Sequence, residues 1–273
     1  MSLKTLKIKT IIANIPIVGR SIFPFRNDDS PYHRKGYIHK HNVSYQNNKG
    51  NSNAKIAVIG LPKSGNTWLT GLFADYFDLP VVHYNADRNK KGVTMFHRSF
   101  SRKMYMRRDI ISVAYIVRDI RDVLVSYYNY SKTDDYRKYV DPNAYYENIE
   151  DFYYSYFLSR LIYQYDWYNH TEEYISHGVP IVKYEDLWDD TSMTLRNLLM
   201  KMNVPVDEDK IKKAVDNNTI AKSKKAGKQL WRKISTSHFR KGGYGGYKED
   251  LPESIIEDIN ERFSPFLKRW GYV

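Results

Sequence analysis

The stretch Lys55–Phe77, KIAVIGLPKSGNTWLTGLFADYF, decides the fold of this 273-residue chain. It begins with an apolar run that ends at Gly60 and has the length and composition of one buried strand. From Trp68 onward apolar side chains recur at helical spacing, which predicts a helix that begins near Asn66 or Thr67. A strand, a glycine-bearing loop and a helix in this order aim backbone N–H groups and the positive end of a helix dipole at an anion.

The loop from Gly60 to Gly65 has the glycine spacing of a Walker A phosphate loop. The two residues that follow are Asn66 and Thr67, where a nucleotidase has lysine followed by serine or threonine. The lysine of this chain is inside the loop, at Lys63, where it can neutralise a phosphate or a leaving oxygen. The alternative interpretation is a tight turn between a strand and a helix, with an incidental lysine.

The composition limits the class of protein. A formal net charge of +12 and a pI near 9.4 indicate an anionic ligand, an acidic polymer or a membrane surface. We do not expect nucleic acid as the partner, because the chain has no arginine-rich arm and no zinc-finger spacing. The chain has no cysteine, which excludes disulfides, thiol catalysis and cysteine-ligated metal and is compatible with the cytoplasm.

We expect a single α/β domain over residues 55–273, preceded by a basic arm over residues 1–54. The arm has one short apolar patch, residues 11–18, which asparagine and proline interrupt and which is too short to cross a bilayer. We therefore expect no transmembrane segment. The arm is predicted to pack against protein or touch a membrane surface rather than serve as a signal peptide, so the expected location is cytoplasmic or membrane-associated.

Short apolar runs alternate with helical patterns through the rest of the domain, which predicts a central, mostly parallel sheet flanked by helices. The further predicted strands span residues 79–84, 93–98, 111–117 and 179–184. The predicted helices span residues 123–128, 152–175, 191–202, 207–215 and 251–270, with N-caps at Thr191 and Asp207. Residues 134–151 are acidic and rich in tyrosine, and we expect them to form a loop or lid.

Three features suited to phosphate lie on predicted loops or strand ends. The first is Lys63–Thr67 in the opening loop. The second is Arg118, at the carboxyl end of a predicted parallel strand, with Ser126 two helical turns later. The third is Arg240–Gly242, in a basic loop rich in glycine. Several anion sites predict a nucleotide-binding α/β enzyme with a P-loop-like core, whose ligand carries phosphates at more than one place.

Four segments resemble the signatures of the cytosolic-type sulfotransferases, in the same order along the chain. Pro62–Trp68, PKSGNTW, resembles the loop that binds the 5′-phosphosulfate of 3′-phosphoadenosine 5′-phosphosulfate (PAPS). Arg118–Tyr128, RDIRDVLVSYY, resembles the second signature, whose arginine and serine hold the 3′-phosphate. Tyr184–Leu187 matches the YED element of the family, and Phe239–Lys248 is similar to its C-terminal RKGxxGxWK loop, with tyrosine in place of tryptophan.

The resemblance implies transfer of the sulfuryl group of PAPS to a hydroxyl or amine without a metal ion. The acceptor would be a hydroxyl-bearing small molecule, a sugar or a lipid. It implies that His97 is the general base, with Met95 and Phe96 where the family has lysine and threonine, and that Lys63 stabilises the leaving phosphate. The donor-binding residues that it implies are Lys63, Ser64, Gly65, Asn66, Thr67, Trp68, Arg118, Ser126, Tyr184, Arg240, Lys241 and Gly242.

Other interpretations stay open at this point. A P-loop kinase would need a lysine at position 66 and a Walker B carboxylate, and Asn66 argues against it. A carbohydrate sulfotransferase of the Golgi type would use a glutamate as its base. A non-enzymatic basic module would bind an anionic polymer or lipid. The acceptor and the oligomeric state are left open by the sequence.

Overall fold

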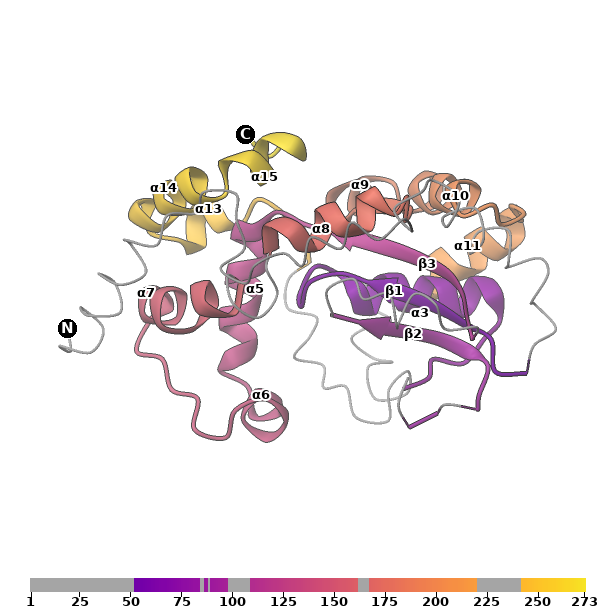
Figure 1. The fold of residues 1–273 in the computed structure, drawn as a ribbon, viewed down its shortest axis with the longest axis horizontal. Coiled ribbons are helices and arrows are strands. Elements are labelled where there is room, and N and C mark those ends of the chain that lie inside the picture. Colours follow the sequence, from indigo (N-terminus) through magenta and orange to yellow (C-terminus); the bar gives the residue numbers. More distant parts are fainter. Residues whose placement is uncertain (1–51, 84–85, 88, 98–108, 162–166, 220–241) are drawn as a thin grey trace, which may run out of the picture. The chain divides into compact units, whose positions relative to one another are not determined.

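The computed structural model describes residues 52–83, 86–87, 89–97, 109–161, 167–219 and 242–273 (Figure 1). These residues belong to two compact units. The larger unit takes its described residues from 52–118, 171–219 and 242–243, and the smaller from 119–170 and 244–273. The predicted basic arm lies outside the described residues, apart from its last three positions.

A four-stranded parallel sheet in the order β2-β1-β3-β4 forms the centre of the larger unit. Strand β1 (Lys55–Ile59) pairs with β2 (Gly92–Phe96) and β3 (Ile110–Val117), and β3 pairs with β4 (Ile181–Lys183). Every residue of β1 and β3 is buried, which is why these strands are continuous apolar runs rather than alternating ones. The predicted α/β fold with a parallel sheet is confirmed.

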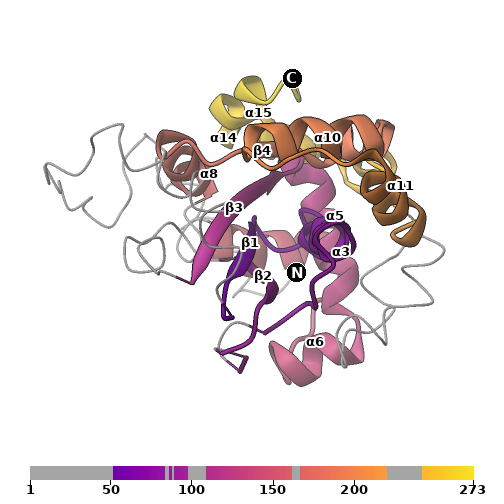
Figure 2. The same ribbon diagram turned by 90° about the vertical axis from the view of Figure 1, so that its right-hand side faces the viewer.

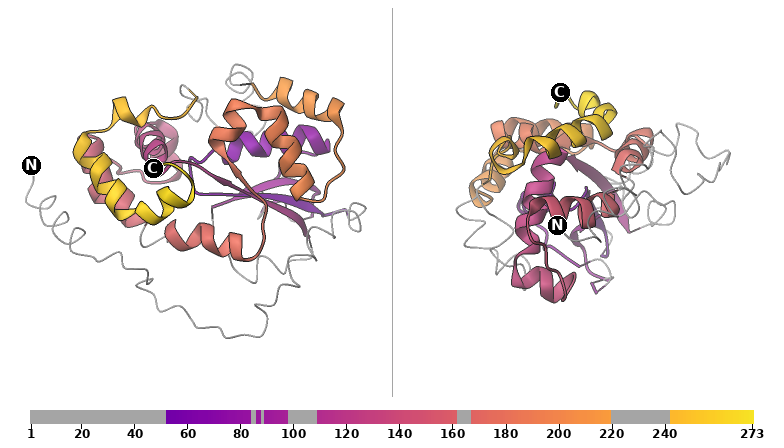
Figure 3. Two further views of the ribbon diagram at one scale, coloured as in Figure 1. Left: turned by 90° about the horizontal axis from the view of Figure 1, so that it is seen from above. Right: turned by 90° about the vertical axis from the view of Figure 1, so that its left-hand side faces the viewer.

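Helices cover both faces of this sheet (Figures 2 and 3). Successive side chains of a strand point to opposite faces. Ile116 of β3 therefore packs into the core that the sheet shares with α3 (Asn66–Phe77). Its neighbour Tyr115 points the other way, where its ring centroid lies 5.2 Å from that of Tyr174 in α8 (Trp167–Ser176).

Three more helices complete the described part of the larger unit: α9 (Tyr184–Asp189), α10 (Thr191–Lys201) and α11 (Glu208–Asn217). The predicted N-cap at Asp207 is confirmed, since its carboxylate accepts a hydrogen bond from the backbone of Lys210. The predicted N-cap at Thr191 is wrong by one residue. The cap is Asp190, while the Thr191 hydroxyl donates to the carbonyl of Leu187 and cannot serve the helix N-terminus.

The smaller unit is helical in its described residues. Its elements are α5 (Ile120–Ser131), α6 (Asp134–Tyr139), α7 (Ile149–Phe152), the π-helical turn η1 (Tyr153–Phe157), α13 (Tyr247–Asp250), α14 (Glu253–Arg262) and α15 (Ser264–Arg269). The prediction that residues 134–151 form a loop is wrong at both ends. Thr133 and Asn148 cap helices α6 and α7 through their side chains. These capping residues are a local signal for helix starts, which the prediction from acidic composition did not use.

Two predicted long helices differ in detail from the structure. Within residues 152–175 the described residues are helical: the π-helical turn follows α7, α8 spans Trp167–Ser176, and residues 162–166 lie outside the described residues. The rings of Phe152, Tyr156 and Phe157 all contact Tyr127, and the wider π turn lets residues four and five apart share one face. Residues 251–270 divide into α14 and α15, because Pro265 has no N–H and cannot continue the first helix.

The predicted strand over residues 79–84 is reduced to a single bridge between Val81 and Val93. Pro80 has no N–H to donate to a ladder, which limits this segment to one contact at the edge of the sheet. Among the described helices, none is both long and apolar enough to cross a bilayer.

Candidate nucleotide-binding site

The loop between β1 and α3, residues 60–65, is called the phosphate loop below. The amide of Asn66 is buried and donates a hydrogen bond of 2.7 Å to the carbonyl of Leu61, and the N–H of Ser64 donates to the same carbonyl at 3.2 Å. Asn66 thus holds the loop together at the position where a Walker A loop has its phosphate-binding lysine. The backbone of Lys63 has a φ of 71°, a left-handed conformation that non-glycine residues rarely adopt.

Gly65 ends the phosphate loop and precedes α3. Its φ of 102° favours glycine, and a Cβ placed there would lie 2.6 Å from Cδ2 of Tyr184. No side chain caps the N-terminus of α3. The first N–H groups of this twelve-residue helix are therefore available to an anion, and the helix dipole favours negative charge there.

Arg118 follows β3 directly and lies beside the phosphate loop. Its Nη1 donates to the carbonyl of Lys63 at 3.2 Å, and its Nη2 donates to the carbonyl of Gly243 at 3.0 Å. The guanidinium carbon is 4.1 Å from the centroid of the Tyr184 ring. Its Nε is buried and has no hydrogen-bond partner among the described residues. Arg118 is thus held in place with one unsatisfied donor, which an anion could satisfy.

The electrostatics of Lys63 also favour an anion. Burial, together with the positive charge of Arg118, lowers the pKa of Lys63 from its ordinary value of 10.5 to about 7. Two cationic side chains close to each other raise the electrostatic free energy of the protein when both are charged. A bound anion between Lys63 and Arg118 would offset this repulsion and restore the pKa of Lys63 toward its ordinary value.

His97 lies just after β2 and contacts the first residue of the phosphate loop. Its Nδ1 is 2.8 Å from the carbonyl oxygen of Gly60. A carbonyl oxygen only accepts hydrogen bonds, so Nδ1 carries the proton and Nε2 of the neutral ring is a proton acceptor. Burial lowers the pKa of His97, and the charge of Lys63 lowers it further. The arrangement therefore favours a neutral histidine with a basic Nε2 at neutral pH.

Three aromatic rings gather beside the phosphate loop, where Tyr184 lies next to Gly65. The ring centroid of Trp68 lies 5.7 Å from that of Tyr184 and 6.2 Å from that of Trp188, and the last two rings are stacked. The indole N–H of Trp68 donates to the carbonyl of Asn218 at 3.0 Å, which fixes the orientation of the ring. Flat aromatic faces beside an anion site suit a nucleobase.

The larger unit brings together most of the predicted site residues. These are Lys63, Ser64, Gly65, Asn66, Thr67, Trp68, His97, Arg118, Tyr184 and Gly242. Ser126 lies on α5, in the smaller unit. Arg240 and Lys241 lie outside the described residues. Within the described part of the chain, no group of three or more histidines and carboxylates could hold a metal ion.

Sequence reasoning missed three contributors. The carbonyl groups of Gly60 and Gly243 carry no side-chain signal, so their roles could be found only in the structure. Trp188 could have been noticed, since it stands four residues after Tyr184 and such residues share one face of a helix.

The larger unit combines a parallel sheet with a glycine-containing loop, two adjacent cations and clustered aromatic rings, all after the ends of its strands. These features together define a nucleotide-binding α/β protein. The chain belongs to the sulfotransferase domain family, which matches residues 53–271. The family resemblance read from the four sequence segments is therefore confirmed.

The chain is similar to several known proteins, three of which follow. Sulfotransferase 1A1 of the mouse is 22% identical over 169 residues, which cover 58% of this chain and 56% of that protein. Among solved structures, mouse sulfotransferase SULT7A1 complexed with PAP has a TM-score of 0.61 at 16% identity, covering 79% of this chain and 85% of its own. Retinol dehydratase in complex with androsterone and inactive cofactor PAP has a TM-score of 0.59 at 14% identity. The match covers 83% of this chain and 86% of the retinol dehydratase chain. The structural likenesses confirm the fold.

Proposed function

We propose that this chain transfers the sulfuryl group of PAPS to the hydroxyl group of an acceptor molecule. The observation that carries the proposal is the hydrogen bond between His97 and the carbonyl of Gly60. It attaches a neutral, basic imidazole to the same loop that carries Lys63. Membership of the sulfotransferase domain family over residues 53–271 supports this reaction class, as do two similar folds solved with PAP.

The residues present fit the donor. The unsatisfied Nε of Arg118 and the lowered pKa of Lys63 are what a site built for anions has when no anion neutralises it. Lys63 and the N–H groups of the phosphate loop would hold the 5′-phosphosulfate, with Ser64 and Thr67. Arg118 would hold the 3′-phosphate, together with Ser126 and Arg240–Gly242. Trp68 and Tyr184 would hold the adenine, and Trp188 extends their aromatic surface.

The proposed chemistry follows from the positions of two side chains. The acceptor hydroxyl has a pKa far above 7, so it needs a general base, and Nε2 of His97 takes its proton. The acceptor oxygen forms a bond to sulfur while the bond between sulfur and the donor's phosphate oxygen breaks. Negative charge grows on that phosphate oxygen, and Lys63 stabilises it. PAPS supplies the sulfuryl group and leaves as adenosine 3′,5′-bisphosphate.

The proposed acceptor is a small molecule with a hydroxyl group, a sugar or a lipid, and an amine would suit the same base. Two of the similar structures contain a hydrophobic ligand. Both are structures of retinol dehydratase, one with androsterone and one with retinol. The predicted contact of the basic arm with a membrane surface would suit a lipid acceptor.

Calorimetric titration with adenosine 3′,5′-bisphosphate and an acceptor screen with labelled PAPS test the proposal. The wild-type protein is expected to bind the bisphosphate and to label at least one acceptor. Replacing His97→Ala should lower the transfer rate by ~10²–10⁴-fold, because the base is lost, while the bisphosphate still binds.

Three outcomes would contradict parts of the proposal. If the bisphosphate does not bind and anionic polymer or lipid binds tightly in a salt-sensitive way, the chain is a basic binding module. Full activity of the His97→Ala variant would remove histidine from the mechanism and favour a glutamate base. Phosphoryl transfer from ATP with magnesium would support the kinase alternative.

A further inference from the structure

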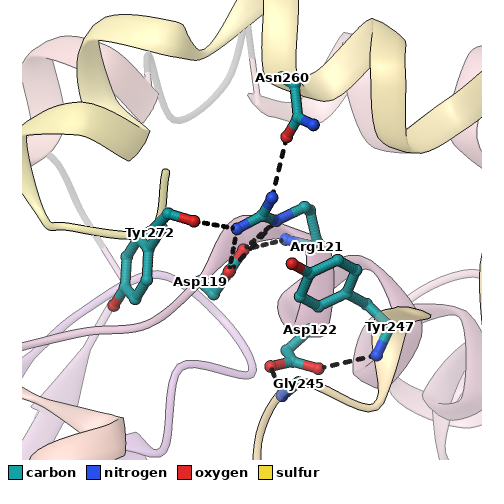
Figure 4. A network of polar contacts seen from close by, with 7 residues as sticks. All are labelled: Asp119, Arg121, Asp122, Gly245, Tyr247, Asn260 and Tyr272. Atoms are coloured by element: carbon teal, nitrogen blue, oxygen red, sulfur yellow. Dashed lines mark hydrogen bonds and ion pairs between the residues drawn. The ribbon is translucent and has the colours of Figure 1, made fainter.

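A network of polar contacts in the smaller unit involves Asp122, the third residue of α5 (Figure 4). The Asp122 side chain is buried, and its two carboxylate oxygens accept hydrogen bonds from two backbone N–H groups. The N–H of Gly245 donates at 2.6 Å and the N–H of Tyr247 at 3.2 Å. A buried carboxylate is thus committed to the backbone of a segment more than a hundred residues away in the sequence.

The two N–H groups need this partner. Gly245 has a φ of 78°, and no atom lies within 4 Å of a Cβ placed there, so only its backbone conformation requires glycine. Tyr247 is the first residue of α13, and that helix has no side-chain cap of its own. The first N–H groups of a helix have no partner within the helix. Asp122 supplies the missing acceptor from α5.

Arg121 strengthens the same connection from the neighbouring position. Its guanidinium carbon lies 4.3 Å from the centroid of the Tyr247 ring. It also forms an ion pair of 2.6 Å with Asp119 and donates to Asn260 Oδ1 at 2.9 Å and to the Tyr272 carbonyl at 2.8 Å (Figure 4). The C-terminal helices of the smaller unit are therefore fixed to the start of α5 by several directional contacts.

The glycine segment, residues 242–246, begins in the larger unit, where its first part makes a contact of its own. The carbonyl of Gly243 accepts the hydrogen bond from Arg118. Gly243 has a φ of 84°, so this part of the segment is in the left-handed region as well. A glycine-rich backbone loses much conformational entropy when it is ordered, and each of these contacts limits the conformations that its part of the segment must give up on binding a ligand.

We propose that Asp122 is a positioning residue for the donor: it fixes the glycine segment in the conformation that receives the 3′-phosphate. This inference rests on the proposed function, in which Gly242, the first residue of the segment, holds that phosphate together with Arg118, Ser126, Arg240 and Lys241. Asp122 does not touch the ligand, because both of its oxygens already accept hydrogen bonds from the segment. Ordering the segment before binding increases donor affinity, since less entropy is lost in the complex.

The test compares two ligands in the full-length protein with the substitution Asp122→Asn. Adenosine 3′,5′-bisphosphate has the 3′-phosphate and adenosine 5′-monophosphate lacks it. The asparagine retains one acceptor oxygen and presents an NH₂ group to the other N–H. We expect the Kd for the bisphosphate to rise about tenfold or more, with the monophosphate changed less than twofold. In assays the KM for PAPS should rise more than kcat falls.

The chain offers a matched control in Asp258. This carboxylate is also largely buried in the smaller unit, where it accepts from the Tyr153 hydroxyl at 2.8 Å and from Arg262 Nε at 2.7 Å. Replacing Asp258→Asn should lower the thermal midpoint without changing the ratio of the two Kd values. A general loss of stability and a selective loss of 3′-phosphate binding are thereby separated.

A second variant covers the case in which Asp122→Asn does not fold. The substitution Gly245→Ala removes no buried group, and its new Cβ would lie in open space. Alanine is strained at the positive φ of this position, so the variant should show the same selective loss of bisphosphate affinity. The inference is overturned if the folded variants weaken both ligands equally or neither. If the wild-type protein binds no bisphosphate at all, it is the proposed function that fails.

Discussion

At the residue scale, we expect Lys63 to make binding of the proposed donor depend on pH. Its pKa is lowered to about 7, so above pH 7 most of the free protein has a neutral Lys63. An anion bound beside it favours the charged form and raises this pKa. Binding at pH 8 should therefore take up about one proton from the solution. The uptake should vanish below pH 6, where Lys63 is already charged in the free protein.

Calorimetry of bisphosphate binding in two buffers with different ionisation enthalpies measures this uptake. The matched control is Lys63→Arg, which keeps a positive charge but does not titrate in this range, so its binding enthalpy should not depend on the buffer. Buffer-independent enthalpies in the wild-type protein at pH 8 would show that Lys63 does not change its charge on binding.

Also at the residue scale, the role proposed for His97 could be argued only with the structure in hand. The sequence presents a histidine between Phe96 and Arg98, and a lone histidine is more often structural than catalytic. Its proposed role as a base depends on the carbonyl of Gly60, thirty-seven residues earlier in the chain, which fixes the proton on Nδ1. Tautomers are set by hydrogen bonds between segments, and a sequence pattern does not contain that information.

At the element scale, the connection between β1 and α3 depends on Gly65. The substitution Gly65→Ala combines a positive φ with a contact of 2.6 Å to Tyr184. We expect it to lower the free energy of unfolding by ~2–4 kcal/mol and to weaken bisphosphate binding, because the start of α3 must shift. Chemical denaturation and calorimetry measure the two effects.

Gly271 gives the matched control for this substitution. It also has a positive φ, 67°, but no atom lies within 4 Å of a Cβ placed there. Gly271→Ala should cost only the backbone strain, ~1 kcal/mol, and leave ligand binding unchanged. Equal losses at Gly65 and Gly271 would mean that the close approach to Tyr184 contributes nothing.

The elements that were predicted well have strong local signals. The buried strands β1 and β3 are continuous apolar runs, and α3 follows its helical periodicity to Phe77. The elements that were predicted poorly depend on their surroundings. The π turn at Tyr153–Phe157 follows from ring packing against Tyr127, which local periodicity does not reveal.

At the scale of the whole molecule, the net charge of +12 raises the question of whether anions bind generally or at one site. A specific ligand present at 100 times its Kd should raise the free energy of unfolding by ~2.7 kcal/mol. We expect this stabilisation from adenosine 3′,5′-bisphosphate. Thermal unfolding measures it, and the Lys63→Met variant should show a smaller shift at the same ligand concentration.

Sodium chloride at equal ionic strength is the control for general screening of the positive charge. It should move the midpoint of the wild-type protein and of the Lys63→Met variant by the same amount. If the bisphosphate did no more than sodium chloride, its stabilising effect would come from the overall charge and not from the phosphate loop.

The sequence by itself determined the parallel α/β fold, the phosphate loop and the family, because these depend on short segments whose periodicity, glycines and charges are local. Only the tertiary structure decided how Arg118 and His97 contact the phosphate loop that carries Lys63. It also decided that Asp122 holds the glycine segment. These features depend on backbone carbonyl and N–H groups from distant segments. Because nearly every residue type carries the same backbone groups, no pattern of side chains could have predicted them.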